Sequence, residues 1–484
     1  MSSIDIQSNE QFFLWHTWFG DVLNNPSGNN GFDIVIGNPP YLRIQELRKS
    51  NSQLADILSK QYKSATGSFD LYVTFVEKAI NIVKKKGVIA YIMPVKWTNS
   101  AFGKGLREFL LKKSFVSTII NFGAYQVFEA STYTGIHIFK LAETLKYLEL
   151  NRNLRSLSEL DLFLNALSTN DFVDIKLNDA DPWVLTNKTI HDLLDKLNRF
   201  PCRLSDVFEK IFQGIATSKD DVYFLYDCQK LDSNLIEGES KYLHRRITIE
   251  KDLVKPLLKG EDVHRYEHLY SNRYVIFPYN LNRNSAELYT EEQIKTMFPK
   301  GYEYLKECES ELRDREKGRL KADKFWYRYI YPKSLTLFQK EKLVAPEISL
   351  GGNFSYDING QFYSTTKVYG YIKKSNCKYS YHFLLELLNS NTFWFFIQNT
   401  GYILRGGYFT FKTNYVAPFP IPNFDDANKQ IINDIEKEVE NILNKRERDS
   451  KCDVSCFMQR IDDLVFQLYG FTKNEIITII SMSF

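Results

Sequence analysis

Long apolar runs are the first thing that this sequence lacks. No stretch of the 484 residues approaches the roughly 20 consecutive apolar residues that a membrane-spanning helix needs. A basic segment followed by an apolar one, the pattern of a secretory signal, is also missing from the start of the chain. We therefore expect a cytoplasmic protein that does not contact membranes.

Cysteine is sparse, and its spacing argues against a metal site. The chain has 6 cysteines, and the closest pair, Cys452 and Cys456, has the i, i+4 spacing of a helix. No further Cys or His lies nearby to complete a ligand set. We expect reduced thiols and no bound metal.

The chain also lacks an excess of charge of one sign. It carries 62 basic and 59 acidic residues, which gives a net charge of only +3. Binding to nucleic acid would therefore depend on local basic patches rather than on the charge of the whole chain. The hydrophobic content of 44% is ample for real cores, and the length predicts about two or three domains.

The most informative stretch runs from Phe32 to Tyr41 and reads F-D-I-V-I-G-N-P-P-Y. Its first half is an apolar, β-branched strand, which we expect to be buried on both faces in a parallel sheet. In such sheets the ligand binds just beyond the carboxyl ends of the strands. The tetrad of Asn38, Pro39, Pro40 and Tyr41 therefore lies where a ligand would be held.

The tetrad suits the transfer of a methyl group to N6 of adenine. That amine is a poor nucleophile because its lone pair is delocalised into the ring. Acceptance of its two hydrogens by the side-chain oxygen of Asn38 and the carbonyl of Pro39 would localise the lone pair, and the prolines would hold both acceptors rigid. Tyr41 would stack on a base swung out of the duplex. The plainer interpretation is a loop that ends a core strand, because proline cannot donate to a β-ladder.

The sequence here resembles the adenine methyltransferases of TaqI-like and type IIG restriction-modification enzymes, and the resemblance covers almost the whole chain. Phe69 to Tyr72 and the apolar-periodic segment 73–83 look like the next helix of that family, and Gly87 to Pro94 looks like its next strand. Residues 127–139 resemble the late hairpin that closes over the target base. The resemblance implies a site-specific, S-adenosyl-L-methionine-dependent DNA adenine-N6 methyltransferase that flips its target in double-stranded DNA. It also implies a prokaryotic cytoplasmic protein associated with the nucleoid.

Glycine is scarce where this family needs it. A strand that ends in a Gly-rich turn normally precedes the tetrad strand and holds the cofactor, whereas residues 1–31 contain only Gly20, Gly28 and Gly31. Residues 12–19 look instead like the short aromatic segment just ahead of the tetrad strand in type IIG proteins. The resemblance thus implies an incomplete cofactor pocket to which this chain contributes Asn38. A separate N-terminal methyltransferase or nuclease polypeptide would supply the other cofactor residues.

The order of strand and helix patterns predicts an α/β fold in four parts. Residues 1–142 read as the C-terminal half of the catalytic domain, with an incomplete doubly wound, Rossmann-like sheet. Residues 143–200 read as a helical connection. Residues 201–422 read as a mixed α+β target-recognition domain that resembles the TaqI-like specificity domain, and residues 423–484 as a C-terminal helical segment.

Basic residues of the target-recognition segment are the candidates for DNA binding, because base edges are read mainly by Arg, Lys, Asn and Gln. Those that stand beside glycines, turns or aromatic runs are Arg405, Lys412, Arg265, Lys324 and Arg328. We expect the mixed-charge run 313–317 to be a solvated helix face instead. Glu341, Lys342 and Glu347 lack a convincing partner set for a nuclease, so we expect no DNA cleavage.

Two alternatives to the methyltransferase remain open. The first is a non-catalytic DNA-binding specificity protein from a split or truncated gene, in which Asn38 and Tyr41 persist as a base pocket without chemistry. The second is an RNA or protein-glutamine methyltransferase, which shares the tetrad but not the long specificity segment. The reading frame immediately upstream separates the first alternative from the leading hypothesis, because it either encodes a Gly-rich cofactor strand or does not.

Overall fold

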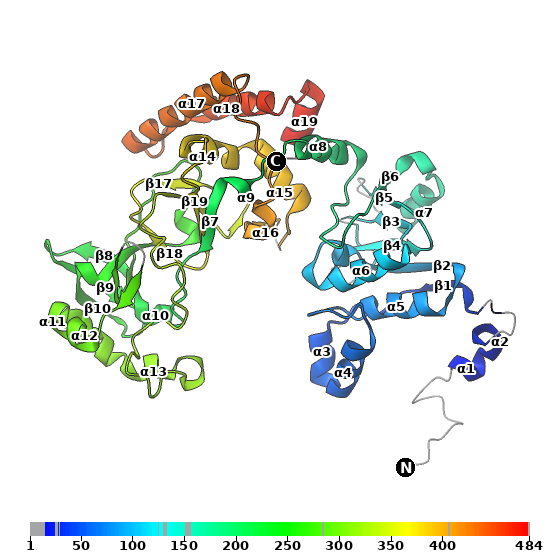
Figure 1. The fold of residues 1–484 in the computed structure, drawn as a ribbon, viewed down its shortest axis with the longest axis horizontal. Helices are drawn as coiled ribbons and strands as arrows, with labels where there is room; N and C mark the ends of the chain where they lie inside the picture. Colours follow the sequence, from blue (N-terminus) through cyan, green and yellow to red (C-terminus); the bar gives the residue numbers. More distant parts are fainter. Residues whose placement is uncertain are drawn as a thin grey trace, which may run out of the picture. The chain divides into compact units, whose positions relative to one another are not determined.

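The computed structural model describes residues 15–24, 28, 30–123, 125–128, 133–150, 156–282, 285–404 and 407–482. The chain divides into two compact units, Met1–Leu194 and Asp195–Phe484, each with its own sheets (Figure 1). Within the described residues, no helix is both long and apolar enough to cross a membrane.

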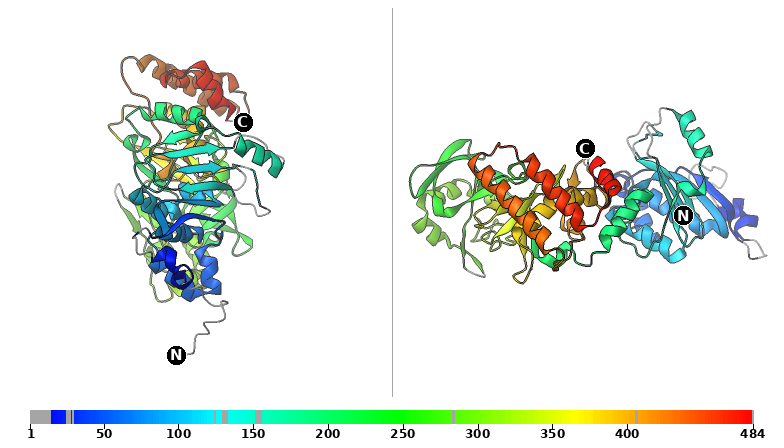
Figure 2. Two further views of the ribbon diagram at one scale, coloured as in Figure 1. Left: turned by 90° about the vertical axis from the view of Figure 1, so that its right-hand side faces the viewer. Right: turned by 90° about the horizontal axis from the view of Figure 1, so that it is seen from above.

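The first unit is built around a six-stranded sheet with the order β1-β2-β4-β3-β5-β6. β1 pairs in parallel with β2, and β3 with β5, whereas the other neighbours are antiparallel (Figures 1 and 2). The strands are β1 (Phe32–Gly37), β2 (Val83–Pro94), β3 (Thr118–Asn121), β4 (Thr134–Phe139), β5 (Leu145–Glu149) and β6 (Val173–Ile175). The α/β class is thus confirmed, whereas the doubly wound arrangement stays a prediction.

Helices α5 and α6 share one hydrophobic cluster with this sheet. Val73 and Val76 of α5 and Leu106 and Leu110 of α6 are fully buried with Ile89 of β2. The apolar positions of α5 recur at helical spacing, so the helix can bury one face. The helices of this unit are α1 (Trp15–Trp18), α2 (Gly20–Leu23), α3 (Ile44–Ser50), α4 (Ser52–Gln61), α5 (Tyr72–Ile82), α6 (Lys104–Lys113), α7 (Leu157–Asn165) and α8 (Lys188–Asn198), which runs into the second unit, with the 3-10 turns η1 (Val95–Thr98), η2 (Ala101–Gly103) and η3 (Thr169–Asp171).

The expected burial of β1 on both faces is wrong. β1 is the edge strand of the sheet, and only one of its faces is covered. Val35 packs against the core, while Ile34 and Ile36 on the other face are 68% and 79% exposed. A run of β-branched residues predicts a strand, but it does not tell whether elements lie over both faces.

The segment 143–200 also differs from the helical connection that we expect from sequence. Besides α7 and α8 it contributes β5 and β6, which extend the sheet beyond β3. Both strands are short and carry charged residues, so neither stands out as an apolar run. The predicted helix after Phe69 and the predicted strand 87–94 correspond to α5 and β2. Of the expected hairpin, β4 lies between β2 and β3, and residues 129–132 fall outside the described residues.

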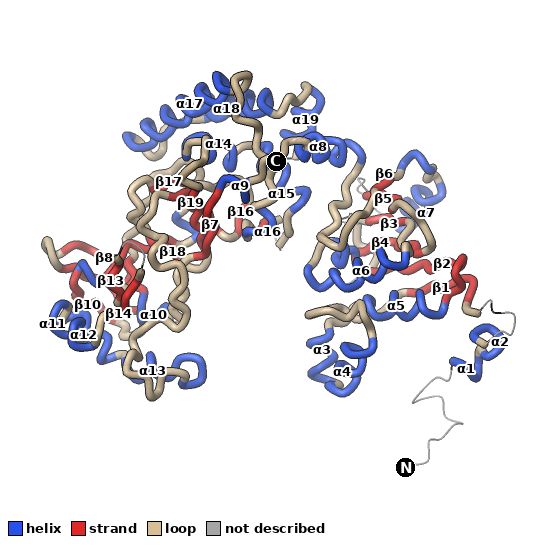
Figure 3. The backbone as a smooth tube through the Cα atoms, viewed as in Figure 1, coloured by secondary structure: helices blue, strands red, loops and turns tan. Residues whose placement is uncertain are grey.

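The second unit has two larger sheets, with the orders β10-β9-β8-β12-β11-β18 and β17-β15-β19-β7, and the strand pairs β13-β14 and β16-β20 (Figure 3). Its strands are β7 (Phe208–Gln213), β8 (Phe224–Lys230), β9 (Leu235–Ser240), β10 (Arg245–Glu250), β11 (Val254–Leu258), β12 (Tyr274–Ile276), β13 (Tyr279–Leu281), β14 (Ala286–Leu288), β15 (Lys342–Pro346), β16 (Ile348–Ser349), β17 (Ser355–Asp357), β18 (Tyr363–Ser364), β19 (Val368–Lys373) and β20 (Phe409–Thr410).

Most helices of the second unit lie between or after these strands. They are α9 (Leu204–Val207), α10 (Asp220–Tyr223), α11 (Glu291–Met297), α12 (Pro299–Glu307), α13 (Glu309–Gly318), α14 (Tyr381–Asn389), α15 (Asn391–Thr400), α16 (Thr413–Val416), α17 (Lys429–Arg448), α18 (Ser455–Leu468) and α19 (Lys473–Ser481), with the 3-10 turns η4 (Lys251–Leu253) and η5 (Gly260–Asp262). α17 buries Ile432, Ile435, Val439 and Ile442 at helical spacing, so the amphipathic helices expected after residue 423 are present.

Candidate functional site

The tetrad leaves the carboxyl end of β1 as a loop. Gly37, the last residue of β1, lies in parallel register with β2, so the loop begins at the edge of the sheet toward which both strands run. Asn38 and Pro40 are exposed, Pro39 is buried and Tyr41 is half-buried. The expected position of the tetrad at a strand end is therefore present in the structure.

Neither of the two predicted hydrogen-bond acceptors has a donor partner in the described part of the chain, and we call such acceptors open. Within the described residues, the side chain of Asn38 makes no hydrogen bond and no donor reaches the carbonyl of Pro39. The ring of Pro39 fixes its own φ, and the following Pro40 restricts the ψ of Pro39 to the extended region, so the direction of that carbonyl is limited. Adjacent open acceptors of this kind match the two N–H groups of a single exocyclic amine.

Tyr41 is held in one orientation by its neighbours. Its hydroxyl donates to the carbonyl of Ile92 at 3.0 Å, and its ring makes edge-to-face contacts with Tyr72 and Phe128 at centroid distances of 6.4 Å each. Burial raises the pKa of Tyr41 to about 12, so the phenol stays neutral and keeps its donor proton. A ring fixed in this way loses little freedom when a flat ligand packs against it.

Asp70 and Tyr72 also lie at this site, although sequence reasoning treated them only as the start of a helix. Asp70 forms an isolated β-bridge with Arg43. Burial raises the pKa of Asp70, and the cations of Arg43 and Lys96 offset only part of that effect. Burial, and then the Asp70 carboxylate, raise the pKa of Tyr72 well above its ordinary value. The buried phenol of Tyr72 and the half-buried carboxyl group of Asp70 thus lie beside the tetrad.

The described residues fit a target base but not a cofactor. Ahead of β1 the structure describes only α1 and α2, each 4 residues long, and no described strand pairs with the outer edge of β1. A dinucleotide-like cofactor needs a glycine turn between a strand and a helix, and no such turn lies among these residues. The described part of the chain therefore provides no cradle for S-adenosyl-L-methionine.

Three of the predicted DNA-binding side chains reach the surface of the second unit. Lys412 is 53% exposed and lies 3.7 Å from a carboxylate oxygen of Glu347. Lys324 is exposed, with its ammonium 4.8 Å from the ring centroid of Phe325. Arg328 pairs with Asp323 at 3.1 Å, and it lines a cavity of about 400 Å³ together with the hydroxyl-bearing side chains of Ser285, Ser334 and Thr336.

Arg265 does not present its charge as predicted. Its Nε and Nη2 atoms are buried and have no hydrogen-bond partner within the described residues. Burial lowers the pKa of Arg265, but the neighbouring Tyr266, Glu386 and Asp462 raise this pKa by more than burial lowers it. The net shift is upward, so the group stays charged. The buried part of this guanidinium lies near the charges of Glu386 in α14 and Asp462 in α18, which does not favour a DNA contact, and the contact stays a prediction. Arg405 lies outside the described residues.

The isolated acids of the second unit do not form a nuclease centre in the described part. Lys342 forms a buried ion pair with Asp357 between β15 and β17, and Glu341 accepts a hydrogen bond from Tyr356. Among the described residues, no cluster of three or more His, Cys, Asp or Glu side chains could hold a metal ion. All six cysteines are free thiols.

Two known families match parts of the chain, one within each unit. Residues 2–128 match the Eco57I restriction-modification methylase, and residues 255–421 match the TaqI-like C-terminal specificity domain. The chain contains an Eco57I-type methylase domain and a TaqI-like specificity domain. The resemblance that the tetrad and the segment after residue 201 indicated is thereby confirmed.

The chain spans only part of the length of the relatives that it matches. The chain is 29% identical over 437 residues to the type II restriction enzyme and methyltransferase RM.Eco57I of Escherichia coli, covering 86% of the chain and 43% of that enzyme. It is 26% identical to the type II methyltransferase M.BstVI of Geobacillus stearothermophilus, covering 96% of the chain and 77% of M.BstVI. A structure of the type IIL restriction-modification enzyme MmeI in complex with DNA matches the fold with a TM-score of 0.54 at 14% identity, covering 93% of this chain and 56% of the MmeI chain.

Proposed function

We propose that this chain is the target-binding and DNA-reading part of a DNA adenine-N6 methyltransferase of a restriction-modification system. The observation that carries the proposal is the pair of open acceptors on Asn38 and Pro39, placed beside Tyr41 at the carboxyl end of β1. The two domain matches and the methyltransferase relatives support the same reaction class.

The residues of the chain act on an adenine that has left the duplex. Tyr41 stacks on the extrahelical base, and Asn38 Oδ1 and the Pro39 carbonyl accept the two N6 hydrogens. These bonds strengthen as N6 becomes tetrahedral, so they stabilise the transition state more than the ground state. S-Adenosyl-L-methionine, when bound by residues beyond those described, supplies the methyl group.

The outer edge of β1 is the proposed attachment point for those further residues. β1 is the edge strand of the sheet, one of its faces carries the exposed Ile34 and Ile36, and the backbone groups of an unpaired strand edge readily pair with another strand. We assign the pairing strand to the N-terminal methyltransferase part, either in a separate polypeptide or upstream in the same one. The predicted cofactor role of Asn38 belongs to this completed pocket.

The second unit reads double-stranded DNA in this proposal. Lys412, Lys324 and Arg328 are the described side chains assigned to that surface, and Arg405 stays a prediction. A DNA substrate places the protein in the cytoplasm beside the nucleoid. The domain limits at residues 142, 200 and 422 likewise stay predictions.

A non-catalytic specificity protein is the second candidate. One observation favours it, namely that the described residues supply no cofactor cradle while the base-binding acceptors are intact. Such a protein would bind DNA and capture the flipped base without transferring a methyl group.

Tyr41→Ala is expected to weaken capture of the flipped base about 5- to 150-fold, which corresponds to the roughly 1–3 kcal/mol of one base–aromatic stack. The readout is the fluorescence of 2-aminopurine placed in turn at each adenine of a duplex enriched by rounds of binding selection. The wild-type chain should raise the fluorescence at one position because the base leaves the stack.

Tyr41→Phe is the matched control, since it keeps the ring and removes only the hydrogen bond to Ile92. It should flip the base nearly as well as the wild type. Equal fluorescence for the alanine and phenylalanine variants would contradict the stacking role, and no rise at any position with the wild type would contradict base flipping by this chain.

A further inference from the structure

Segment 313–333 of the second unit holds a local excess of positive charge. It contains eight basic and three acidic residues, although the net charge of the whole chain is only +3. The rest of the chain is therefore close to neutral or slightly acidic. A polyanion is therefore attracted more strongly to this segment than to the rest of the chain.

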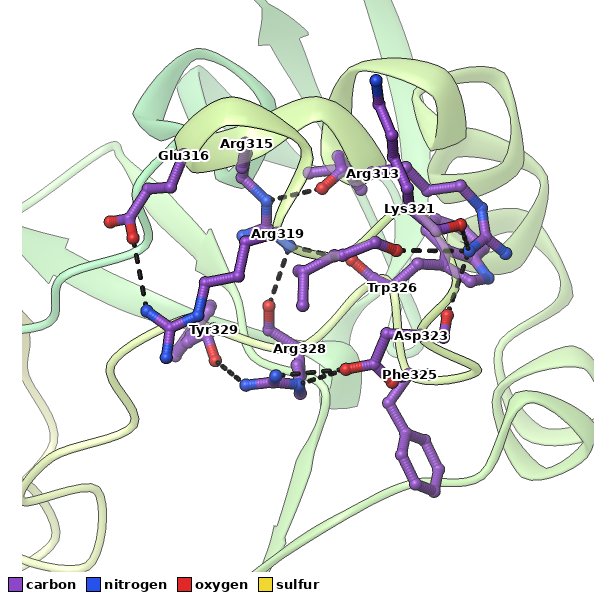
Figure 4. A network of polar contacts seen from close by, with 12 residues as sticks. Arg313, Arg315, Glu316, Arg319, Lys321, Asp323, Phe325, Trp326, Arg328 and Tyr329 are labelled. Carbon is purple, nitrogen blue, oxygen red and sulfur yellow. Dashed lines mark hydrogen bonds and ion pairs between the residues drawn. The ribbon is translucent and has the colours of Figure 1, made fainter.

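The buried side chain of Arg315 holds the segment in place through hydrogen bonds to backbone carbonyls. Its side chain is 4% exposed, and its guanidinium donates to the carbonyls of Leu312 at 2.9 Å, Thr217 at 2.8 Å, Trp326 at 2.8 Å and Arg328 at 2.9 Å. Figure 4 shows this guanidinium between the turn and the backbone of the aromatic run. The expected solvated face at 313–317 is thus wrong at this residue, because carbonyls of the following segment and of the distant Thr217 converge on the guanidinium.

The turn that follows Arg315 is left-handed at successive residues. Glu316, Lys317 and Gly318 have φ of +49°, +64° and +80°, and α13 is interrupted there. Only glycine adopts this region without strain. Strained backbone persists where the surroundings hold it in place, and it is enriched at functional sites.

Contacts of Glu316 hold the turn against its neighbours and occupy its carboxylate. Tyr331 donates to it at 2.9 Å, Arg319 lies 3.4 Å away, and Ser218 donates at 3.4 Å. The guanidinium of Arg319 also lies 5.7 Å from the ring centroid of Tyr331. The turn and the segment at 331–333 are therefore fixed side by side.

Lys317 and Lys333 are cations of this segment that take part in none of these contacts. Both are exposed, and neither has an acidic partner within the described residues. Lys317 stands on the strained turn, and Lys333 lies two residues after Tyr331 on the adjoining segment. We call Lys317, Arg319 and Lys333 the basic surface.

We propose that the basic surface grips the sugar-phosphate backbone of double-stranded DNA. The inference rests on the proposed function, and it adds a contact that fixes the position of the duplex without reading its sequence. Lysine suits this task because its ammonium is a mobile point charge that pairs with a phosphate oxygen from many directions. A fixed turn keeps the charges in place before DNA arrives, which limits the entropy lost on binding.

The test compares the full chain with its Lys317→Ala/Lys333→Ala variant by fluorescence anisotropy on two duplexes, one enriched by binding selection and one unrelated, over a series of salt concentrations. Each phosphate contact contributes about 0.9 to the slope of log affinity against log salt, so the double variant should lower the slope by about 2. Its affinity at about 0.1 M salt should fall tenfold or more on both duplexes alike.

Two further variants isolate the charge at these positions. Lys317→Arg/Lys333→Arg keeps both cations and should restore the slope. Lys429→Ala/Lys437→Ala removes two exposed lysines from α17 and should leave it unchanged. If the wild type binds DNA and the salt slope of Lys317→Ala/Lys333→Ala equals that of the wild type, the proposed phosphate binding by the basic surface is wrong. The proposed function is unaffected by that result. A loss confined to the selected duplex overturns the phosphate role, and a wild type that binds neither duplex overturns both proposals.

Discussion

Asn38→Ala is expected to reduce methyl transfer to DNA by about 10²–10³-fold or more, the range seen when one preorganised hydrogen-bonding group is removed from a transition state. The affinity for DNA should stay nearly unchanged, because Asn38 contacts the base amine and not a phosphate. The measurement is transfer of a tritiated methyl group by the complex of this chain with the proposed N-terminal methyltransferase part, which we call the upstream segment.

Asn38→Asp and Asn81→Ala are the controls for this variant. Asn38→Asp keeps an acceptor oxygen at the same place and should lose less activity than Asn38→Ala. Asn81 is an exposed asparagine on α5 that makes no hydrogen bond with its side chain in the described structure, so its alanine variant should behave as the wild type. Transfer by Asn38→Ala at the wild-type rate would rule out the proposed role of the amide oxygen.

The isolated chain is expected to bind S-adenosyl-L-methionine at least about 100-fold more weakly than the complex with the upstream segment, a difference of about 2.7 kcal/mol. The physical reason is that the described residues provide no glycine turn and contain no strand that pairs with the outer edge of β1. Isothermal titration calorimetry of the chain alone, of the upstream segment alone and of their mixture measures the difference.

Ile36→Lys tests whether β1 is the point of attachment. Ile36 is 79% exposed, so lysine should be tolerated in the isolated chain, whereas a charge on an edge strand opposes pairing with a second strand. The variant should fold normally, lose the complex and leave cofactor binding at the level of the isolated chain. Micromolar binding by the isolated wild-type chain would show that its pocket is already complete.

The strand that ends in the tetrad could be predicted from sequence because the signal is local. A β-branched run, a glycine and two prolines determine where the strand stops, whatever its neighbours are. The environment of the same strand could not be predicted in this way. Whether Ile34 and Ile36 are buried depends on which elements cover that face, and the residues of β1 carry no information about them.

The basic residues show the same limit more sharply. Charge and spacing suggested a solvated face for 313–317 and a DNA contact for Arg265, yet the structure buries Arg315 among four backbone carbonyls and the Arg265 guanidinium beside Glu386 and Asp462. The counter-charges of Arg265 at Glu386 and Asp462, and the acceptor that Thr217 provides to Arg315, are far away in sequence. Exposure of an arginine is a property of the tertiary fold, so single-sequence patterns predict it poorly.

The most direct test of the central claim is the identity of the methylated nucleoside. DNA from a strain without adenine methylation is incubated with this chain, the proposed N-terminal methyltransferase part and S-adenosyl-L-methionine, digested to nucleosides and analysed by mass spectrometry. The account predicts N6-methyladenine as the methylated product, and its loss with Asn38→Ala. Methylated cytosine in its place, or DNA that is bound but remains unmethylated, would contradict it.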